Sequence, residues 1–189
     1  MNPTELIQAC LHHDTIAQRN FYEQYSPRVM GICTRYAAGA KDTEAMALYV
    51  IKHLFEEIVN CPGDVNMERW VEERTIWNAV EYLHQDKHRY FIAKTTRYME
   101  NKKKVEGEVD ETTLSKEESK KTYLAALQSL TPSYRILYNL TYIDEIAPPV
   151  IVKNLQIAEE TYKAELGEAK FQFKQYLNTY LHEQGVPRQ

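Results

Sequence analysis

The stretch from residue 87 to residue 104 carries the side chains best suited to binding phosphate. Its basic residues are Lys87, Arg89, Lys94, Arg97, Lys102, Lys103 and Lys104, with Tyr90, Phe91 and Tyr98 among them. Only Asp86 and Glu100 oppose this positive charge. A basic surface interspersed with aromatic rings suits nucleic acid. A solvated helix face would have the same composition, and both interpretations stay open.

Metal and catalytic chemistry find little support in the sequence. His84 and His88 lie four residues apart and would share one helical face, but no third metal ligand is in view. The sequence contains no glycine-rich phosphate loop and no nucleophile elbow. It also contains no catalytic pair of carboxylates, or of cysteine and histidine, in a sequence context that would support one. We therefore expect a protein that is not an enzyme and that needs no metal or cofactor.

The cysteines indicate the compartment. Cys10, Cys33 and Cys61 are far apart, odd in number and without a C-x-x-C pair, which fits a reducing cytoplasm better than a disulfide framework or a zinc site. The first residues do not resemble a signal peptide, and no apolar run approaches the length of a membrane span. We expect a cytoplasmic protein without membrane insertion.

Composition limits the fold and the partners. The chain has 189 residues, 43% hydrophobic and 26% charged, with a formal net charge of -4. This balance predicts a globular protein and excludes a protein whose whole surface is basic. Any contact with nucleic acid must therefore be made by a local basic patch. Six glycines and seven prolines are few for this length. Because apolar residues recur mostly at three and four positions, we predict an all-α fold.

The basic stretch should lie on the end of a long central helix, residues 67–97. Trp70 and Trp77 are two helical turns apart, and Ile76, Val80 and Leu83 continue an apolar stripe at intervals of four and three. After this stripe the basic residues begin. The helix would therefore run from a packed core into a charged surface.

Capping residues predict three helices before the central one. Asn2 should begin the first, and Asp14 should cap the second, which we expect to be interrupted at Pro27. Gly39 should end that helix, and Asp42 should cap the third. The apolar arc of this third helix is broader than one core face requires.

An abrupt change of charge divides the chain. The lysines at 102–104 are followed by an acidic run, with little that is apolar, which is typical of a linker. We predict a helical domain at 1–101, a charged linker at 102–117 and a second helical domain at 118–189.

The second domain has the helix order of a helix-turn-helix. Pro148-Pro149 should begin a short helix, and a tight turn at 155–158 should lead into a long helix from Glu159. Two packed helices of any bundle would give the same pattern. Acidic residues outnumber basic ones in the long helix, which would oppose binding to phosphate: Glu159, Glu160, Glu165 and Glu168 against Lys163 and Lys170.

Four stretches, 6–45, 67–90, 124–146 and 146–173, together resemble a known family. They carry, in order, Phe21-Tyr22, Tyr25, Arg35-Tyr36 and Asp42-x-Glu44; Trp70 and Asn78; Tyr134-Arg135; and Ile157, Thr161, Lys163, Leu166, Ala169 and Lys170. The combination resembles a bacterial RNA polymerase sigma factor of the extracytoplasmic-function class, group 4 of the sigma-70 family. The resemblance covers nearly the whole chain.

The resemblance implies a sigma-2-like bundle and a sigma-4-like helix-turn-helix domain that bind core RNA polymerase and promoter DNA. An anti-sigma protein is a further candidate partner. By position, the residues implied for the minus-ten strand are Asn78, His84, Lys87 and Arg89, and those for the major groove are Thr161, Lys163 and Lys170. The polymerase-binding positions are Asp42, Glu44, Ala45, Leu48 and Tyr49.

Several positions depart from the family pattern. Ala45, Leu48 and Tyr49 make an apolar face where the family has a polar one, Glu168 replaces an arginine, and Gln156 replaces the glycine of the turn. If that turn needs a positive φ, glutamine would cost about 1 kcal/mol. These departures suggest an alternative: a sigma-fold interaction protein that does not recognise promoters and uses the apolar face to bind a protein partner or to form a homodimer.

Overall fold

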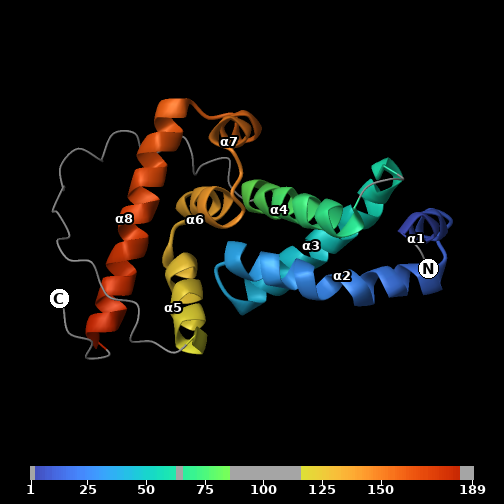
Figure 1. The fold of residues 1–189 in the computed structure, drawn as a ribbon, viewed down its shortest axis with the longest axis horizontal. Helices are drawn as coiled ribbons and strands as arrows, with labels where there is room; N and C mark the ends of the chain where they lie inside the picture. Colours follow the sequence, from blue (N-terminus) through green and yellow to red (C-terminus); the bar gives the residue numbers. More distant parts are fainter. Residues whose placement is uncertain (1–2, 63–65, 86–115, 184–189) are drawn as a thin grey trace. The chain divides into compact units, whose positions relative to one another are not determined.

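The computed structural model describes residues 3–62, 66–85 and 116–183. The elements are α1 (Pro3–Leu11), α2 (Thr15–Tyr36), α3 (Ala40–Glu57), the 3-10 turn η1 (Ile58–Asn60), α4 (Met67–Gln85), α5 (Lys116–Ser129), α6 (Pro132–Tyr138), the π-helical turn η3 (Asn139–Ile143), α7 (Pro148–Leu155) and α8 (Glu159–Glu183) (Figure 1). Within these ranges all regular structure is helical, so the all-α prediction is confirmed. None of the described helices is long and apolar enough to cross a membrane.

The helices form two compact units, α1–α4 and α5–α8. In the first unit, α2, α3 and α4 pack against one another, and α1 lies against α2 and η1. Phe21 of α2 is 1% exposed, and its ring centroid lies 4.8 Å from that of Tyr25 and 5.1 Å from that of Phe55 on α3. The periodic apolar residues around it, among them Val29, are buried. This burial is the main source of stability for helices of this length.

Of the two caps predicted for the first unit, one is confirmed and the other is wrong. Asp14 does cap α2: its Oδ1 accepts hydrogen bonds from two backbone N–H groups of the first turn at 2.8 and 3.0 Å. The predicted cap at Asp42 is wrong, because α3 already begins at Ala40 with Gly39 as its N-cap. Asp42 lies in the first turn and accepts a hydrogen bond from the Ala38 N–H at 2.7 Å. Its carboxylate thus satisfies a backbone donor that precedes the helix.

The predicted interruption of α2 at Pro27 is also wrong. The helix is continuous from Thr15 to Tyr36 with Pro27 inside it. Proline removes one backbone hydrogen bond and strains the preceding turn, but here it lies on the exposed side of the helix. Tyr25 and Val29, on either side of it, are both buried. Packing of these neighbours on the core offsets the lost bond, which local sequence does not reveal.

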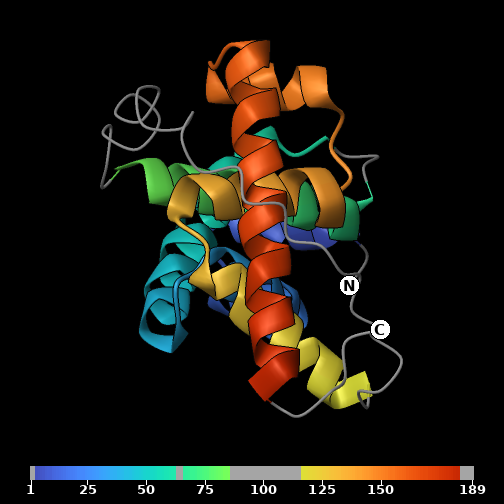
Figure 2. The ribbon, with the colours of Figure 1, turned by 90° about the vertical axis from the view of Figure 1, so that its left-hand side faces the viewer.

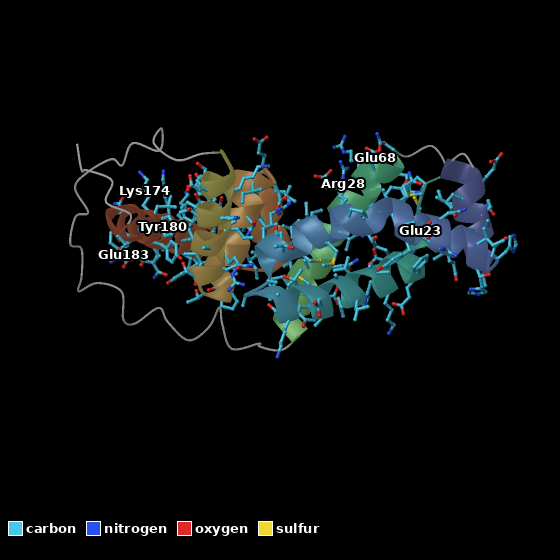
Figure 3. All side chains as sticks on the ribbon, turned by 90° about the horizontal axis from the view of Figure 1, so that it is seen from below. Glu23, Arg28, Glu68, Lys174, Tyr180 and Glu183 are labelled. Atoms are coloured by element: carbon cyan, nitrogen blue, oxygen red, sulfur yellow. The ribbon has the colours of Figure 1, made fainter. Side chains whose placement is uncertain are left out.

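Charged pairs join the helices of the first unit at its surface. Arg28 of α2 lies 3.8 Å from Glu68 of α4 (Figure 3). It also lies 3.4 Å from Glu72 of the same helix. Arg74 of α4 lies 3.7 Å from Glu57 at the end of α3. Exposed pairs of this kind contribute about 0.2–1 kcal/mol each. They therefore favour one alignment of the helices, whereas the apolar core supplies most of the stability.

The second unit is built along α8. Helices α5 and α6 pack against it, and α7 lies near its N-terminal end (Figure 2). Phe173 of α8 is 2% exposed, stacked on Tyr138 at 4.4 Å between ring centroids and edge-on to Tyr123 at 4.9 Å. The surrounding core contains Ala126, Leu127, Leu130, Tyr134, Tyr138, Ala169 and Leu177. One phenylalanine thus joins α5, α6 and α8.

The turn between α7 and α8 follows the prediction. Helix α7 ends at Leu155, and Gln156 adopts the left-handed conformation with φ 53 and ψ 39. The N–H of the next residue, Ile157, donates to the Val152 carbonyl at 3.2 Å, which closes the end of α7. The turn therefore does need a positive φ at this position, which the sequence left as a condition. A residue with a Cβ in this conformation costs about 1 kcal/mol or more.

We predict that Gln156→Gly will stabilise the second unit by about 1 kcal/mol, because glycine has no Cβ to strain the left-handed turn. The Gln156 side chain is exposed, so little packing is lost. Thermal unfolding of the full chain should show the transition of this unit at a temperature roughly 4–8 °C higher.

The matched control is Gln175→Gly, which alters an exposed glutamine within α8. It should lower stability by about 1 kcal/mol, since glycine is unfavourable inside a helix. Equal losses in the two variants would contradict strain at Gln156.

Candidate nucleic-acid and polymerase interface

The residues implied for the minus-ten strand are only partly within the described structure. Asn78 of α4 is 3% exposed, so its amide is not presented at a surface where a base could contact it. His84, in the last turn of α4, is half-buried. Lys87 and Arg89 lie outside the described residues, as does the whole basic stretch from residue 87 to residue 104. Their role in binding DNA stays a prediction.

Burial of Asn78 accompanies that of a second polar residue on the same helix. Thr75, three positions earlier, is also buried. Neither Thr75 Oγ1 nor Asn78 Nδ2 has a hydrogen-bond partner within the part of the chain that the structure describes. A buried polar group without a partner costs about 1–3 kcal/mol, and neither side chain contributes exposed polar surface.

On α8 the structure brings together two of the three residues implied for the major groove. Lys163 and Lys170 are exposed and two turns apart, which places them on one face. Thr161, two residues before Lys163, is partly buried and faces another direction. The Lys170 ammonium lies 5.8 Å from the centroid of the Tyr142 ring, within range of a cation–π contact.

Electrostatics on α8 disfavour phosphate. Lys163 Nζ lies 2.6 Å from Glu159 Oε1. This hydrogen bond lowers the pKa of Glu159 and raises that of Lys163, so both groups are charged and paired with each other. Over the helix as a whole, five glutamates accompany three lysines. The described face of α8 is therefore not the cationic surface that duplex DNA requires.

Glu165 is the least well solvated carboxylate of α8. It is half-buried, and its Oε2 is buried without a hydrogen-bond partner among the described residues. Burial raises the pKa of Glu165. Burial makes the charged form of this carboxylate less favourable in the folded chain than in the unfolded chain. The charge that Glu165 carries at neutral pH therefore opposes folding of the second unit.

The positions implied for polymerase lie along α3. Glu44 and Ala45 are exposed, and Leu48, one turn further on, is 71% exposed. Asp42 is half-buried and engaged with the backbone before the helix. The structure thus places an apolar side chain at the centre of this surface, with carboxylates towards its N-terminal end.

Tyr49 belongs to a neighbouring aromatic cluster. Its ring centroid lies 3.9 Å from that of His53 and 5.5 Å from that of Tyr82 on α4, and the His53 Nδ1 lies 2.8 Å from the Tyr49 carbonyl oxygen. All three side chains are half-buried. The cluster packs α3 on α4, so Tyr49 is less accessible to a partner than Leu48.

Sequence reasoning missed Val59, which is 63% exposed in η1. It follows Leu48 by eleven residues, about three helical turns, and so lies close to the same face. Between them, Lys52 Nζ and Glu56 Oε1 form an exposed ion pair at 3.6 Å. The signal was the spacing of Leu48, Lys52, Glu56 and Val59, four, four and three residues apart.

The described residues include no group of three histidine, cysteine or acidic side chains that could hold a metal ion. Burial raises the pKa of Cys33 to about 12 and also raises the pKa of Cys10 and Cys61. None of these thiols is therefore activated as a nucleophile. The expectation that the protein is not an enzyme stays a prediction.

Comparison with known proteins identifies the class of the fold. No family model matches the chain, and no curated protein matches it. Solved structures of sigma factors do match, and the fold is sigma-factor-like. RpoE of Bartonella quintana, solved with the anti-sigma factor NepR, matches with a TM-score of 0.50 and 11% identity over 85% of this chain and 96% of that one. CnrH, solved with the cytosolic domain of CnrY, matches with a TM-score of 0.47 and 11% identity over 93% and 97%.

We predict that Glu165→Gln will stabilise the second unit at neutral pH but not in acid. The folded-state pKa of Glu165 is raised, so the folded chain binds this proton more tightly than the unfolded chain does. The contribution of Glu165 to the stability of the wild type is therefore greatest below its unfolded pKa and is lost as the pH rises through its folded pKa. Thermal melts at roughly pH 4 to 8 should show the advantage of the variant growing with pH.

The exposed Glu160 supplies the control for this experiment. Glu160→Gln should give no comparable gain at neutral pH, because its carboxylate is already solvated. A gain for Glu165→Gln that persisted unchanged into acid would show that the charge is not its cause.

Proposed function

We propose that the chain is a sigma-like transcription initiation protein that binds core RNA polymerase and promoter DNA in the cytoplasm. The observation that carries this proposal is the sigma-factor-like fold, which extends over 85% of the chain in the match to RpoE. Two features of the chain support it: a helix-turn-helix formed by α7 and α8, and a basic stretch that follows α4 in sequence.

DNA contact is assigned mainly to Lys87 and Arg89. The acidic excess of α8 and the pairing of Lys163 with Glu159 leave no net positive charge on that helix. The stretch after α4 holds the highest density of positive charge in the sequence. Since phosphate contacts supply most of the affinity for DNA, the basic stretch should dominate binding. Asn78 is not part of this assignment, because it is buried.

Polymerase docking is assigned to the outer face of α3, centred on Leu48 with Glu44 and Ala45 beside it. Leu48 is 71% exposed, whereas Met46, Val50 and Leu54 of the same helix are buried. An apolar side chain at the centre of an interface, ringed by polar groups, is the arrangement that contributes most to binding.

A second candidate function is favoured by the same exposed leucine. The protein would be a sigma-fold interaction module that binds a protein through α3 without recognising promoters. RpoE was solved in complex with an anti-sigma factor, so an anti-sigma protein is one candidate partner for this chain. The two functions differ in whether core polymerase binds.

Replacing both Lys87 and Arg89 with alanine should weaken DNA binding and flatten its dependence on salt. Each lost phosphate contact lowers the slope of log K against log salt by about one, so the double variant should lose about two. Fluorescence anisotropy with a labelled promoter fork, measured across a salt series, gives both quantities.

Lys174→Ala removes one exposed lysine from the C-terminal half of α8 (Figure 3) and is the control, with little expected change. Unchanged affinity and slope in the double variant would remove Lys87 and Arg89 from the assignment.

Polymerase docking is tested by co-sedimentation of the purified chain with core RNA polymerase. We expect saturable binding that Leu48→Asp weakens at least about tenfold, because a charge at the centre of an apolar contact must be desolvated. Ile16→Asp is the matched control, since Ile16 is also highly exposed but lies on α2. Absence of binding by the wild-type chain would favour the interaction module.

A further inference from the structure

The outer face of α3 and η1 carries an ordered set of exposed side chains. In chain order they are Leu48, Lys52, Glu56 and Val59: an apolar residue, a cation, an anion and an apolar residue. The two charged groups pair with each other at 3.6 Å. All four lie on or near one helical face, because their spacing follows the helical period. We name this set the α3 stripe.

The α3 stripe is complementary to itself when reversed. The midpoint between Leu48 and Val59 and the midpoint between Lys52 and Glu56 differ by only half a residue, or about 0.8 Å along the helix. A two-fold axis through this point would set Leu48 of one copy against Val59 of the other and Lys52 against Glu56. From this complementarity we propose that the α3 stripe binds a second copy of the same chain, with the two α3 helices antiparallel.

The arrangement of charges favours a second copy of the chain over an unrelated protein as the partner of the α3 stripe. In the antiparallel arrangement each ammonium lies closer along the axis to the partner's carboxylate than to the partner's ammonium. Because the Lys52–Glu56 pair already exists within one helix, the two charges are held in place before association. Isologous contacts of this kind, in which residue i meets j and j meets i, are typical of homodimers.

The interface is small, so the dimer should be weak and form in the micromolar range. It would cover Leu48, the centre of the proposed polymerase surface. Dimerisation and polymerase docking would therefore exclude each other. The dimer itself needs neither DNA nor polymerase, and its test is independent of the proposed function.

Sedimentation equilibrium of the full chain from roughly 1 to 200 µM tests the proposal, this being the range in which so small an interface dissociates. The wild type should pass from monomer to dimer. Leu48→Asp and Val59→Asp should each raise the dissociation constant at least about tenfold, whereas Ile16→Asp, an exposed position on α2, should not. A wild-type monomer throughout, or a dimer indifferent to Leu48→Asp, would overturn the proposal.

Charge reversal tests the antiparallel register. Lys52→Glu and Glu56→Lys, studied separately, should each weaken dimerisation, because like charges then face each other across the axis. An equimolar mixture of the two variants should regain approximately wild-type affinity as a heterodimer, although neither chain then has the Lys52–Glu56 ion pair within its own α3. Size-exclusion chromatography with light scattering, with one variant carrying a mass tag, detects that species. Failure of the mixture to associate would overturn the arrangement.

Discussion

Burial of a single phenylalanine in each unit is the constraint on which the rest of the fold depends. Phe21 joins α2 to α3, and Phe173 joins α5, α6 and α8. Around both, tyrosine rings complete the contact, which explains how a chain with fourteen tyrosines keeps many of them inside. With these rings in place, the outward faces of α3 and α8 are determined, and so are the charges and apolar groups that a partner can contact.

Features set by neighbouring residues could be predicted from the sequence. The helical periodicity predicted the all-α fold, Asp14 was identified as a cap, and the turn before α8 was placed at the right residues. Each depends on steric or hydrogen-bonding preferences within a few residues. The exposure of Leu48 was also expected, because α3 has more apolar residues than one core face can bury.

Features set by tertiary packing could not be predicted in this way. Pro27 does not interrupt α2, because its neighbours are anchored in the core. Asn78 matched a DNA-binding position of the resembled family, yet its side chain is buried. Val59 shares the helical spacing of Leu48, but that spacing alone did not tell that its side chain is exposed. In all three cases the outcome depends on which side of a helix meets another helix, and a periodic pattern specifies that only approximately.

The overlap of the α3 stripe with the proposed polymerase surface has a consequence for gene dosage. When monomer and dimer equilibrate well above the dissociation constant, free monomer increases only as the square root of total protein, so a twofold increase in synthesis yields about 1.4-fold more monomer. Only the monomer would present Leu48 to another protein. The concentration of the active monomer would then change less than the total amount of protein does. Fluctuations in expression would therefore have a smaller effect on the targets of the monomer.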